Sequence, residues 1–120
     1  MAKILIVDDS ITSRRILKGI LEEYGHEVVA EAENGEEGYI KYMEIKPDML
    51  TMDITMPKMD GLECLKVIKH KDAEAKVVMI TAAGQKDKMM EAIKNGASEF
   101  VTKPFDKEEI GKVIDRVLRE

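Results

Sequence analysis

The chain contains few cysteine, histidine and aromatic residues. Its 120 residues include one cysteine, no tryptophan, three tyrosines and two phenylalanines. A single cysteine excludes an internal disulfide and any metal site built from several cysteines. The two histidines, His26 and His70, lie far apart and show no metal-ligand spacing. A disulfide scaffold and a metal site based on cysteine or histidine are therefore excluded.

Long apolar runs are also missing. The longest, Ile4–Val7 and Val77–Ile80, are far shorter than the roughly 18 residues that a membrane span needs. The first run lies between Lys3 and the acids Asp8 and Asp9, and it is too short for a signal peptide. With 24 acidic and 19 basic residues, the net charge of −5 argues against non-specific binding to nucleic acid. We expect a cytoplasmic domain that contacts neither membranes nor nucleic acids.

The length and composition fit one folded domain. A chain of 120 residues lies within the commonest range of domain sizes. Its content of 44% apolar and 36% charged residues is typical of a globular chain rather than a disordered one. No linker, low-complexity segment or internal repeat interrupts it. We expect residues 1–120 to form a single monomeric domain with no effector domain attached.

Two kinds of segment alternate along the chain. Short segments, most of them rich in Val, Ile or Leu, predict buried strands over Lys3–Asp8, Glu27–Ala32, Asp48–Asp53, Lys76–Thr81 and Glu99–Thr102. Between them, apolar residues at steps of three and four predict helices over Ile11–Tyr24, Gly35–Ile45, Leu62–His70, Lys86–Asn95 and Lys107–Arg119. This (βα)5 alternation predicts an α/β fold with a parallel sheet and helices on both faces.

Reactive side chains follow the predicted strands. Asp8 and Asp9 end the first strand, Asp53 ends the third, Thr81 ends the fourth, and the fifth runs into Lys103. Ligands of open parallel sheets bind beyond the carboxyl ends of the strands, so these side chains are expected to converge at one edge. Taken singly, each acid could cap a helix, and the lysine could be an ordinary surface residue. Taken together, they predict a functional site.

Three clustered acids need a cation. Two unit charges about 4 Å apart repel by about 4 kcal/mol at an effective dielectric of about 20, and one lysine does not balance three acids. Oxygen ligands suit a hard ion, and Mg²⁺ is the best candidate. A metal beside a carboxylate, a lysine and a hydroxyl predicts phosphoryl transfer to that carboxylate. Asp53 is the expected acceptor, because the neighbours Asp8 and Asp9 can share the metal.

Four spaced motifs carry a resemblance to a known family. They are ILIVDDS (4–10), MDITMPKMDG (52–61), ITAAG (80–84) and TKPF (102–105). The chain resembles the receiver domain of response regulators over its whole length, and most of all the single-domain chemotaxis type. The resemblance implies a flavodoxin-like, doubly wound sheet of strand order 2-1-3-4-5.

The resemblance also implies a role for each site residue. Asp53 is the phosphoacceptor and, with Asp9, a direct Mg²⁺ ligand. The backbone carbonyl of Thr55 is the third protein ligand, and Asp8 acts through a water molecule. Lys103 pairs with Asp53 and then with the phosphoryl group, and its peptide bond to the following proline is cis.

A switch follows from the same resemblance. Thr81 moves toward the phosphoryl oxygens, and the ring of Phe100, at the aromatic switch position, turns inward. Many chemotaxis relatives have tyrosine there, so no role for a hydroxyl carries over. The movement changes the face built by the last two helices and the last strand. The expected partners are a histidine kinase as phosphodonor, a downstream protein such as a flagellar motor switch component, and a phosphatase.

Two alternatives stay open at this point. One is a phosphorelay or adaptor receiver outside chemotaxis. The other is a Mg²⁺-dependent phosphohydrolase of the haloacid-dehalogenase type, whose DxDx[TV] signature needs a second aspartate where this chain has Thr55. We expect no enzyme of that kind, only a protein that catalyses its own phosphorylation and slow dephosphorylation. By the same resemblance, Thr55 and Ala83 occupy positions where relatives vary the groups that place the attacking water. Because Ala83 offers no polar atom, the dephosphorylation step should be slow.

Overall fold

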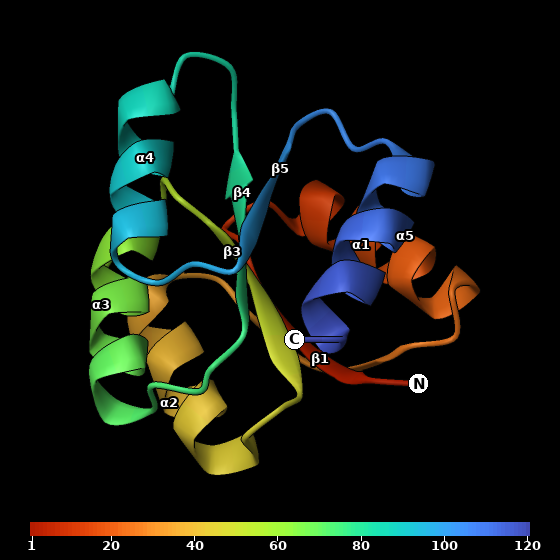
Figure 1. Ribbon diagram of the computed structural model, residues 1–120, viewed down its shortest axis with the longest axis horizontal. Helices are drawn as coiled ribbons and strands as arrows, with labels where there is room; N and C mark the ends of the chain where they lie inside the picture. Colours follow the sequence, from red (N-terminus) through yellow and green to blue (C-terminus); the bar gives the residue numbers. More distant parts are fainter.

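Strands and helices alternate over residues 1–120, all of which the computed structural model describes (Figure 1). In chain order the elements are β1 (Lys3–Val7), α1 (Ile11–Glu23), β2 (Glu27–Ala32), α2 (Gly35–Ile45), β3 (Met49–Asp53), α3 (Gly61–Lys71), β4 (Val77–Thr81), α4 (Lys86–Lys94), β5 (Glu99–Thr102) and α5 (Lys107–Leu118). The predicted (βα)5 alternation is confirmed. None of the helices combines the length and the apolar character that a membrane span requires.

The observed element boundaries differ from the predicted ones by no more than one residue at any end, and side-chain hydrogen bonds explain two of the differences. Asp8 lies just outside β1, because its Oδ1 accepts the backbone N–H of Ser10 at 2.9 Å and starts the turn into α1. Helix α3 begins earlier than predicted because Asp60 caps it, accepting the N–H of Glu63 at 2.9 Å. Local hydrogen bonds of this kind leave no trace in apolar periodicity.

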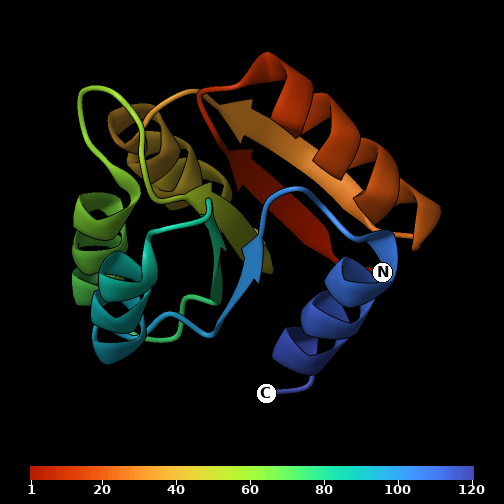
Figure 2. The same cartoon turned by 90° about the horizontal axis from the view of Figure 1, so that it is seen from above.

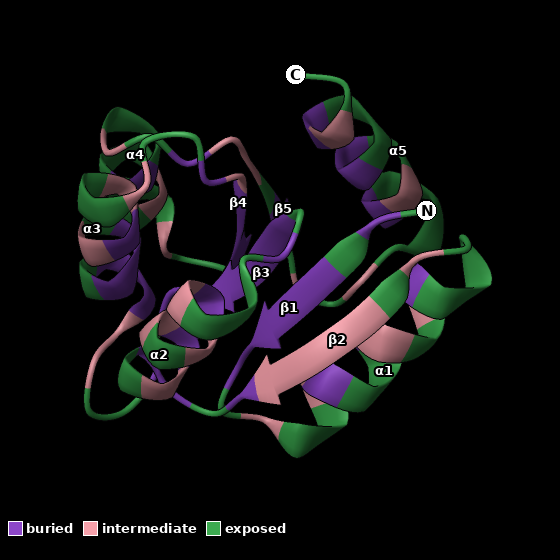
Figure 3. Ribbon diagram, turned by 90° about the horizontal axis from the view of Figure 1, so that it is seen from below, coloured by how far each residue is buried: buried purple, intermediate pink, exposed green.

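The sheet is parallel throughout, with strand order β2-β1-β3-β4-β5, which confirms the order that the resemblance implied. Neighbouring strands are aligned so that Ile6 in β1 lies beside Thr51 in β3, which lies beside Val78 in β4. The order reverses between β1 and β3, so the loops after these two strands open a crevice at their carboxyl ends. β2 is the half-buried edge strand beside the buried β1 (Figure 3).

Helices cover both faces of the sheet (Figure 2). Helices α2, α3 and α4 lie on one face, where Leu5 and Val7 of β1 point; α1 and α5 cover the other, where Ile4 and Ile6 point. All four side chains are fully buried. The continuous apolar run therefore forms a strand with no solvent-facing side, as predicted.

One glycine and one threonine stand out along β3 and the loop after it. A Cβ on Gly61 would lie 2.1 Å from the carbonyl oxygen of Asp53, so only glycine lets α3 start this close to the end of β3. Inside the strand, the hydroxyl of Thr51 is buried and has no hydrogen-bond partner. Strand β3 therefore carries an unsatisfied polar group only two residues before Asp53.

Candidate functional site

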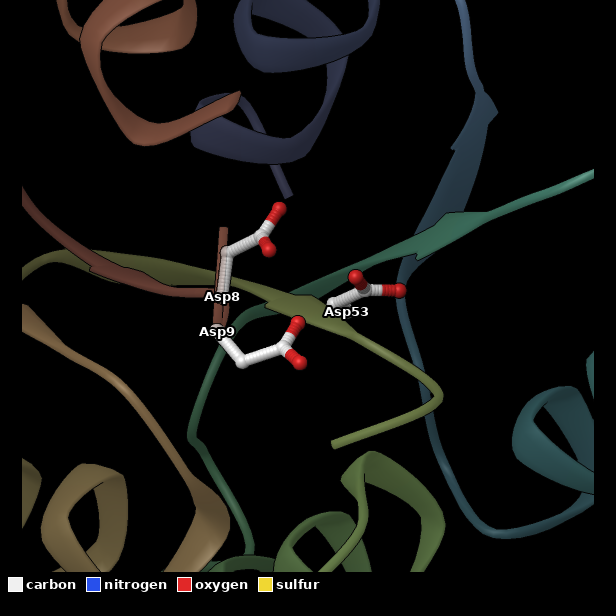
Figure 4. A group of neighbouring side chains, drawn as sticks. All are labelled: Asp8, Asp9 and Asp53. Atoms are coloured by element: carbon white, nitrogen blue, oxygen red, sulfur yellow. The ribbon is translucent and has the colours of Figure 1, made fainter. Parts of the chain in front are cut away.

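Three carboxylates meet at the carboxyl ends of β1 and β3. Asp8, Asp9 and Asp53 each offer an oxygen atom, and these atoms lie within 4.8 Å of one another. Figure 4 shows Asp9 reaching from the end of β1 toward Asp53 at the end of β3. Asp8 and Asp53 are buried, whereas Asp9 is exposed to solvent. The predicted convergence of the three acids is confirmed.

A single lysine contacts two of the three acids. The Lys103 ammonium lies 3.0 Å from Asp8 Oδ2 and 3.1 Å from Asp53 Oδ2. Its backbone N–H donates to the carbonyl of Thr81 at 2.8 Å, which fixes the start of the loop after β5 to the end of β4. The peptide bond between Lys103 and Pro104 is cis, as the resemblance implied. The pairing of Lys103 with Asp8 was not part of the sequence prediction.

Burial and charge shift the pKa values in this cluster. Burial, followed by the negative charge of Asp8, raises the pKa of the Asp53 carboxyl, although Lys103 partly offsets both effects. Burial alone lowers the pKa of the Lys103 ammonium, but its contacts with Asp8 and Asp53 outweigh burial and raise the pKa overall. The cluster thus holds more negative charge than its one lysine balances.

This donor set fits a hard divalent cation. All three candidate ligands are carboxylate oxygens, two of them are buried, and the cluster has an excess of negative charge. Hard cations prefer such oxygen ligands and leave room for water and phosphate oxygens. Asp8, Asp9 and Asp53 could therefore hold a metal ion.

The two residues expected to act as a switch lie on neighbouring strands. Thr81 ends β4 and is 2% exposed, while Phe100 in β5 is 38% exposed. Phe100 pairs in register with Met79, and Thr81 pairs with Thr102. Thr81 directly follows Ile80, which pairs with Asp53, and its carbonyl is bound by Lys103. Phe100, in contrast, is partly exposed on the edge strand β5.

Arg14 contributes to the site but was missed in the sequence. One guanidinium nitrogen, Nη1, donates to the carbonyl of Asp8 at 2.6 Å, and Nε donates to Glu31 at 3.0 Å. Although charged, Arg14 is buried on the same face of α1 as Leu17 and Leu21. Its helical spacing to these leucines was a usable signal, because a cation on a buried stripe needs partners.

Gln85 was also missed, and no sequence signal pointed to it. Its side-chain Nε2 donates to the hydroxyl of Thr55 at 2.6 Å, and its Oε1 accepts the N–H of Ala82 at 2.8 Å. Thr55 lies in the loop that follows Asp53, the last residue of β3. The contact joins loops that are far apart in sequence, so it depends on the folded arrangement alone.

A doubly wound parallel sheet with an acidic triad, a strand-end threonine and a bridging lysine at one edge defines a receiver domain. The chain belongs to this family, since the model of the response regulator receiver domain matches residues 4–115. It is a signalling domain and not a metabolic enzyme.

The similar proteins narrow the class further. The chain is 48% identical to the chemotaxis protein CheY of Listeria monocytogenes, over 99% of this chain and 100% of that protein. It is also 48% identical to CheY of Bacillus subtilis, over 97% of each. The CheY in the CheX–CheY–BeF3–Mg complex of Borrelia burgdorferi superposes with a TM-score of 0.92 at 38% identity, covering 96% of this chain and 87% of that one. The chain is therefore a receiver of the chemotaxis type, and the phosphohydrolase alternative is not favoured.

Proposed function

We propose that Asp53 accepts a phosphoryl group from the phosphohistidine of a histidine kinase. The observation that carries this proposal is the buried Asp53 carboxylate, which faces Lys103 at 3.1 Å within a group of three acids. An Asp53 oxygen attacks phosphorus, the phosphorus–nitrogen bond breaks, and the imidazole leaves. Membership of the receiver family supports the same assignment.

Each neighbouring residue has a distinct part in this step. Lys103 orients the Asp53 carboxylate and then pairs with the phosphoryl oxygens, where it offsets their charge. Asp9, Asp53 and the backbone carbonyl of Thr55 are the proposed direct ligands of Mg²⁺, with Asp8 acting through water. Mg²⁺ supplies charge neutralisation at the transferring phosphoryl group. The Arg14 guanidinium donates to the backbone carbonyl of Asp8 and so holds Asp8 in place.

Phosphorylation is proposed to change a partner-binding face built by α4, β5 and α5. The new group adds up to about two negative charges within reach of Thr81. As Thr81 moves toward it, space opens that the exposed ring of Phe100 can fill. Met90 and Ile93 on α4 are also exposed, at 53% and 45%, so this face presents apolar side chains to a partner.

The energy of this switch indicates that a partner takes part in it. Moving an equilibrium from 1:99 to 99:1 requires about 5.5 kcal/mol. One charge-assisted hydrogen bond from Thr81 contributes roughly 1.5–3 kcal/mol. Binding of a downstream protein to the active form therefore completes the shift.

The proposed setting is a cytoplasmic chemotaxis pathway. A histidine kinase is the donor, a flagellar motor switch component is the proposed target, and a phosphatase removes the phosphoryl group. The CheX–CheY complex from Borrelia burgdorferi supports partner binding by a receiver of this type. We propose that the domain acts as a monomer and that its output is a protein–protein contact.

Intact mass spectrometry after incubation with acetyl phosphate and Mg²⁺ tests the phosphoryl transfer. The expected result is a gain of one phosphoryl group, which is lost with Asp53→Asn or in the presence of EDTA. Asp72→Asn is the matched control, because Asp72 is an aspartate outside the acidic cluster and should leave the gain unchanged. Full phosphorylation of the Asp53→Asn variant would contradict the assignment of the acceptor.

A further inference from the structure

One primary amide connects the two loops that border the acidic cluster. Gln85 donates to the Thr55 hydroxyl at 2.6 Å and accepts from the Ala82 N–H at 2.8 Å. Thr55 lies two residues after Asp53, and Ala82 directly follows Thr81. The Gln85 side chain thus ties the loop of the proposed phosphoacceptor to the loop of the proposed switch.

The loop after β4 has little else to hold it. Residues 82–84 form no backbone–backbone hydrogen bond, and Gly84 has a φ of +87°. Gln85 precedes the first residue of α4, yet its side chain does not cap the helix. The amide instead reaches back over the loop. The carbonyl of Thr81 is already held by the backbone of Lys103, so Gln85 fixes the remaining N–H of the same peptide unit.

We infer that Gln85 is a positioning residue that holds this loop in the resting arrangement and opposes phosphorylation-dependent switching. The inference rests on the proposed function of Asp53 and Thr81. Thr81 and Ala82 share a peptide bond, so a backbone movement of Thr81 toward Asp53 carries the Ala82 N–H with it. Because Gln85 is itself bound to Thr55, that movement breaks the connection between the loops.

Phosphorylation provides the competitor that releases the loop. A phosphoryl group on Asp53 presents three strong acceptor oxygens. Hydrogen bonds to a charged acceptor are roughly twice as strong as those to a neutral amide oxygen. Once it is freed from Gln85, the Ala82 N–H can donate to a phosphoryl oxygen, which is a stronger acceptor than the amide. The Gln85 contact therefore raises the free energy needed for switching but does not prevent it.

Beryllofluoride, which mimics a phosphoryl group on a carboxylate, measures this threshold without a kinase. ¹⁹F NMR titration of the full chain in Mg²⁺ gives its affinity. Gln85→Met keeps a side chain of similar length and removes both hydrogen bonds, so beryllofluoride should bind about three- to tenfold more tightly. Lys88→Ala is the matched control, because Lys88 is exposed on α4 and should leave the affinity at the wild-type value.

A second variant tests whether Gln85 acts through Thr55. Thr55→Val removes the hydroxyl and keeps both the side-chain shape and the backbone carbonyl. It should tighten beryllofluoride binding by about two- to fivefold. The double variant should bind no more tightly than Gln85→Met alone, because both changes break one connection. Destabilisation alone weakens ligand binding, so a merely structural role for Gln85 predicts the opposite direction.

The outcomes separate this inference from the proposed function. If wild-type protein binds beryllofluoride and Gln85→Met binds it equally or more weakly, Gln85 does not oppose switching and the inference is wrong. Additive effects of the Gln85 and Thr55 variants would also overturn it. If wild-type protein gives no bound ¹⁹F signal in Mg²⁺, the proposed function itself fails, and the inference fails with it.

Discussion

Carboxylates at the two ends of the sheet have pKa values shifted in opposite directions. At the carboxyl end, burial and Asp8 raise the pKa of Asp53, so the fold disfavours its charged form. Near the amino end, Asp72 accepts the Tyr42 hydroxyl at 2.7 Å and the N–H of Glu74 at 3.1 Å. The hydrogen bond from Tyr42 is the main reason that the pKa of Asp72 is lowered. The ionised Asp53 carboxylate therefore lowers the stability of the fold, whereas the ionised Asp72 carboxylate raises it.

The opposite shifts indicate that the acidic cluster of the proposed site lowers the stability of the folded chain. A group whose charged form is disfavoured in the folded state lowers stability at neutral pH, and a group whose charged form is favoured raises it. Lys103 offsets part of the excess charge at the carboxyl end but is shared between Asp8 and Asp53. The carboxyl end is therefore prepared for an incoming cation, whereas the amino end is complete without a ligand.

The largest expected effect is stabilisation by Mg²⁺ at the carboxyl end. At a concentration about 100 times the dissociation constant, the ion should add about 2.7 kcal/mol to the free energy of unfolding. Urea unfolding with and without Mg²⁺ measures it. Asp9→Ala should mainly weaken Mg²⁺ binding and so reduce the gain at the same concentration. An equal gain in that variant would show that the ion binds elsewhere.

Asp53→Asn should raise the free energy of unfolding by about 1–2 kcal/mol at pH 7 without metal, which would sharpen the contrast. The ionised carboxylate lowers stability fully above its raised folded pKa, and this cost disappears as the pH falls below the unfolded value of 3.8. The gain should therefore vanish near pH 3. Lys103 keeps its contact with Asp8 in this variant. A variant less stable than wild type at pH 7 would contradict the comparison.

Thr51→Val tests whether uncompensated polar groups are confined to the site. The buried Thr51 hydroxyl lies on β3 between the two ends and has no partner. Valine has the same shape without the hydroxyl, so stability should rise by about 1 kcal/mol. Thermal unfolding measures the change, and unaltered beryllofluoride binding is the expected control. A loss of stability would mean that the hydroxyl has a partner in solution.

Tyr42→Phe should have the smallest effect and the opposite sign. It removes the hydroxyl that Asp72 accepts, so the free energy of unfolding should fall by about 0.5–1 kcal/mol at pH 7. The stabilisation is present above the unfolded pKa of 3.8 and is lost as the pH falls through the lowered folded value. The difference from wild type should shrink in acid. A pH-independent difference would assign the effect to packing instead.

Much of the site could be predicted because strand ends are local features. Asp8, Asp9 and Asp53 follow apolar runs that predict strands, and the carboxyl ends of parallel strands share one edge. Their convergence followed without any knowledge of the contacts. The alternation of strands and helices did not determine the strand order, which came from the resemblance to a family.

Other features of the site could not be predicted in this way. The resemblance implied that Lys103 pairs with Asp53, but its second contact, with Asp8, depends on where the loop after β5 crosses the sheet edge. The pairing of Gln85 with Thr55 and Ala82 depends on two loops that carry no periodic signal. Nothing in the sequence assigned a contact to His26, but it is half-buried in the fold, and its Nδ1 accepts the N–H of Ala2 at 3.1 Å.

The sequence by itself determined the strands, the helices, the two-sided burial of β1 and the acidic edge, because apolar periodicity and strand ends are properties of short segments. Only the tertiary structure decided which charges pair and which are left in excess. Side chains from distant loops meet according to strand register and helix packing, and burial then sets their pKa values. The raised pKa of Asp53 and the lowered pKa of Asp72 are therefore properties of the folded chain.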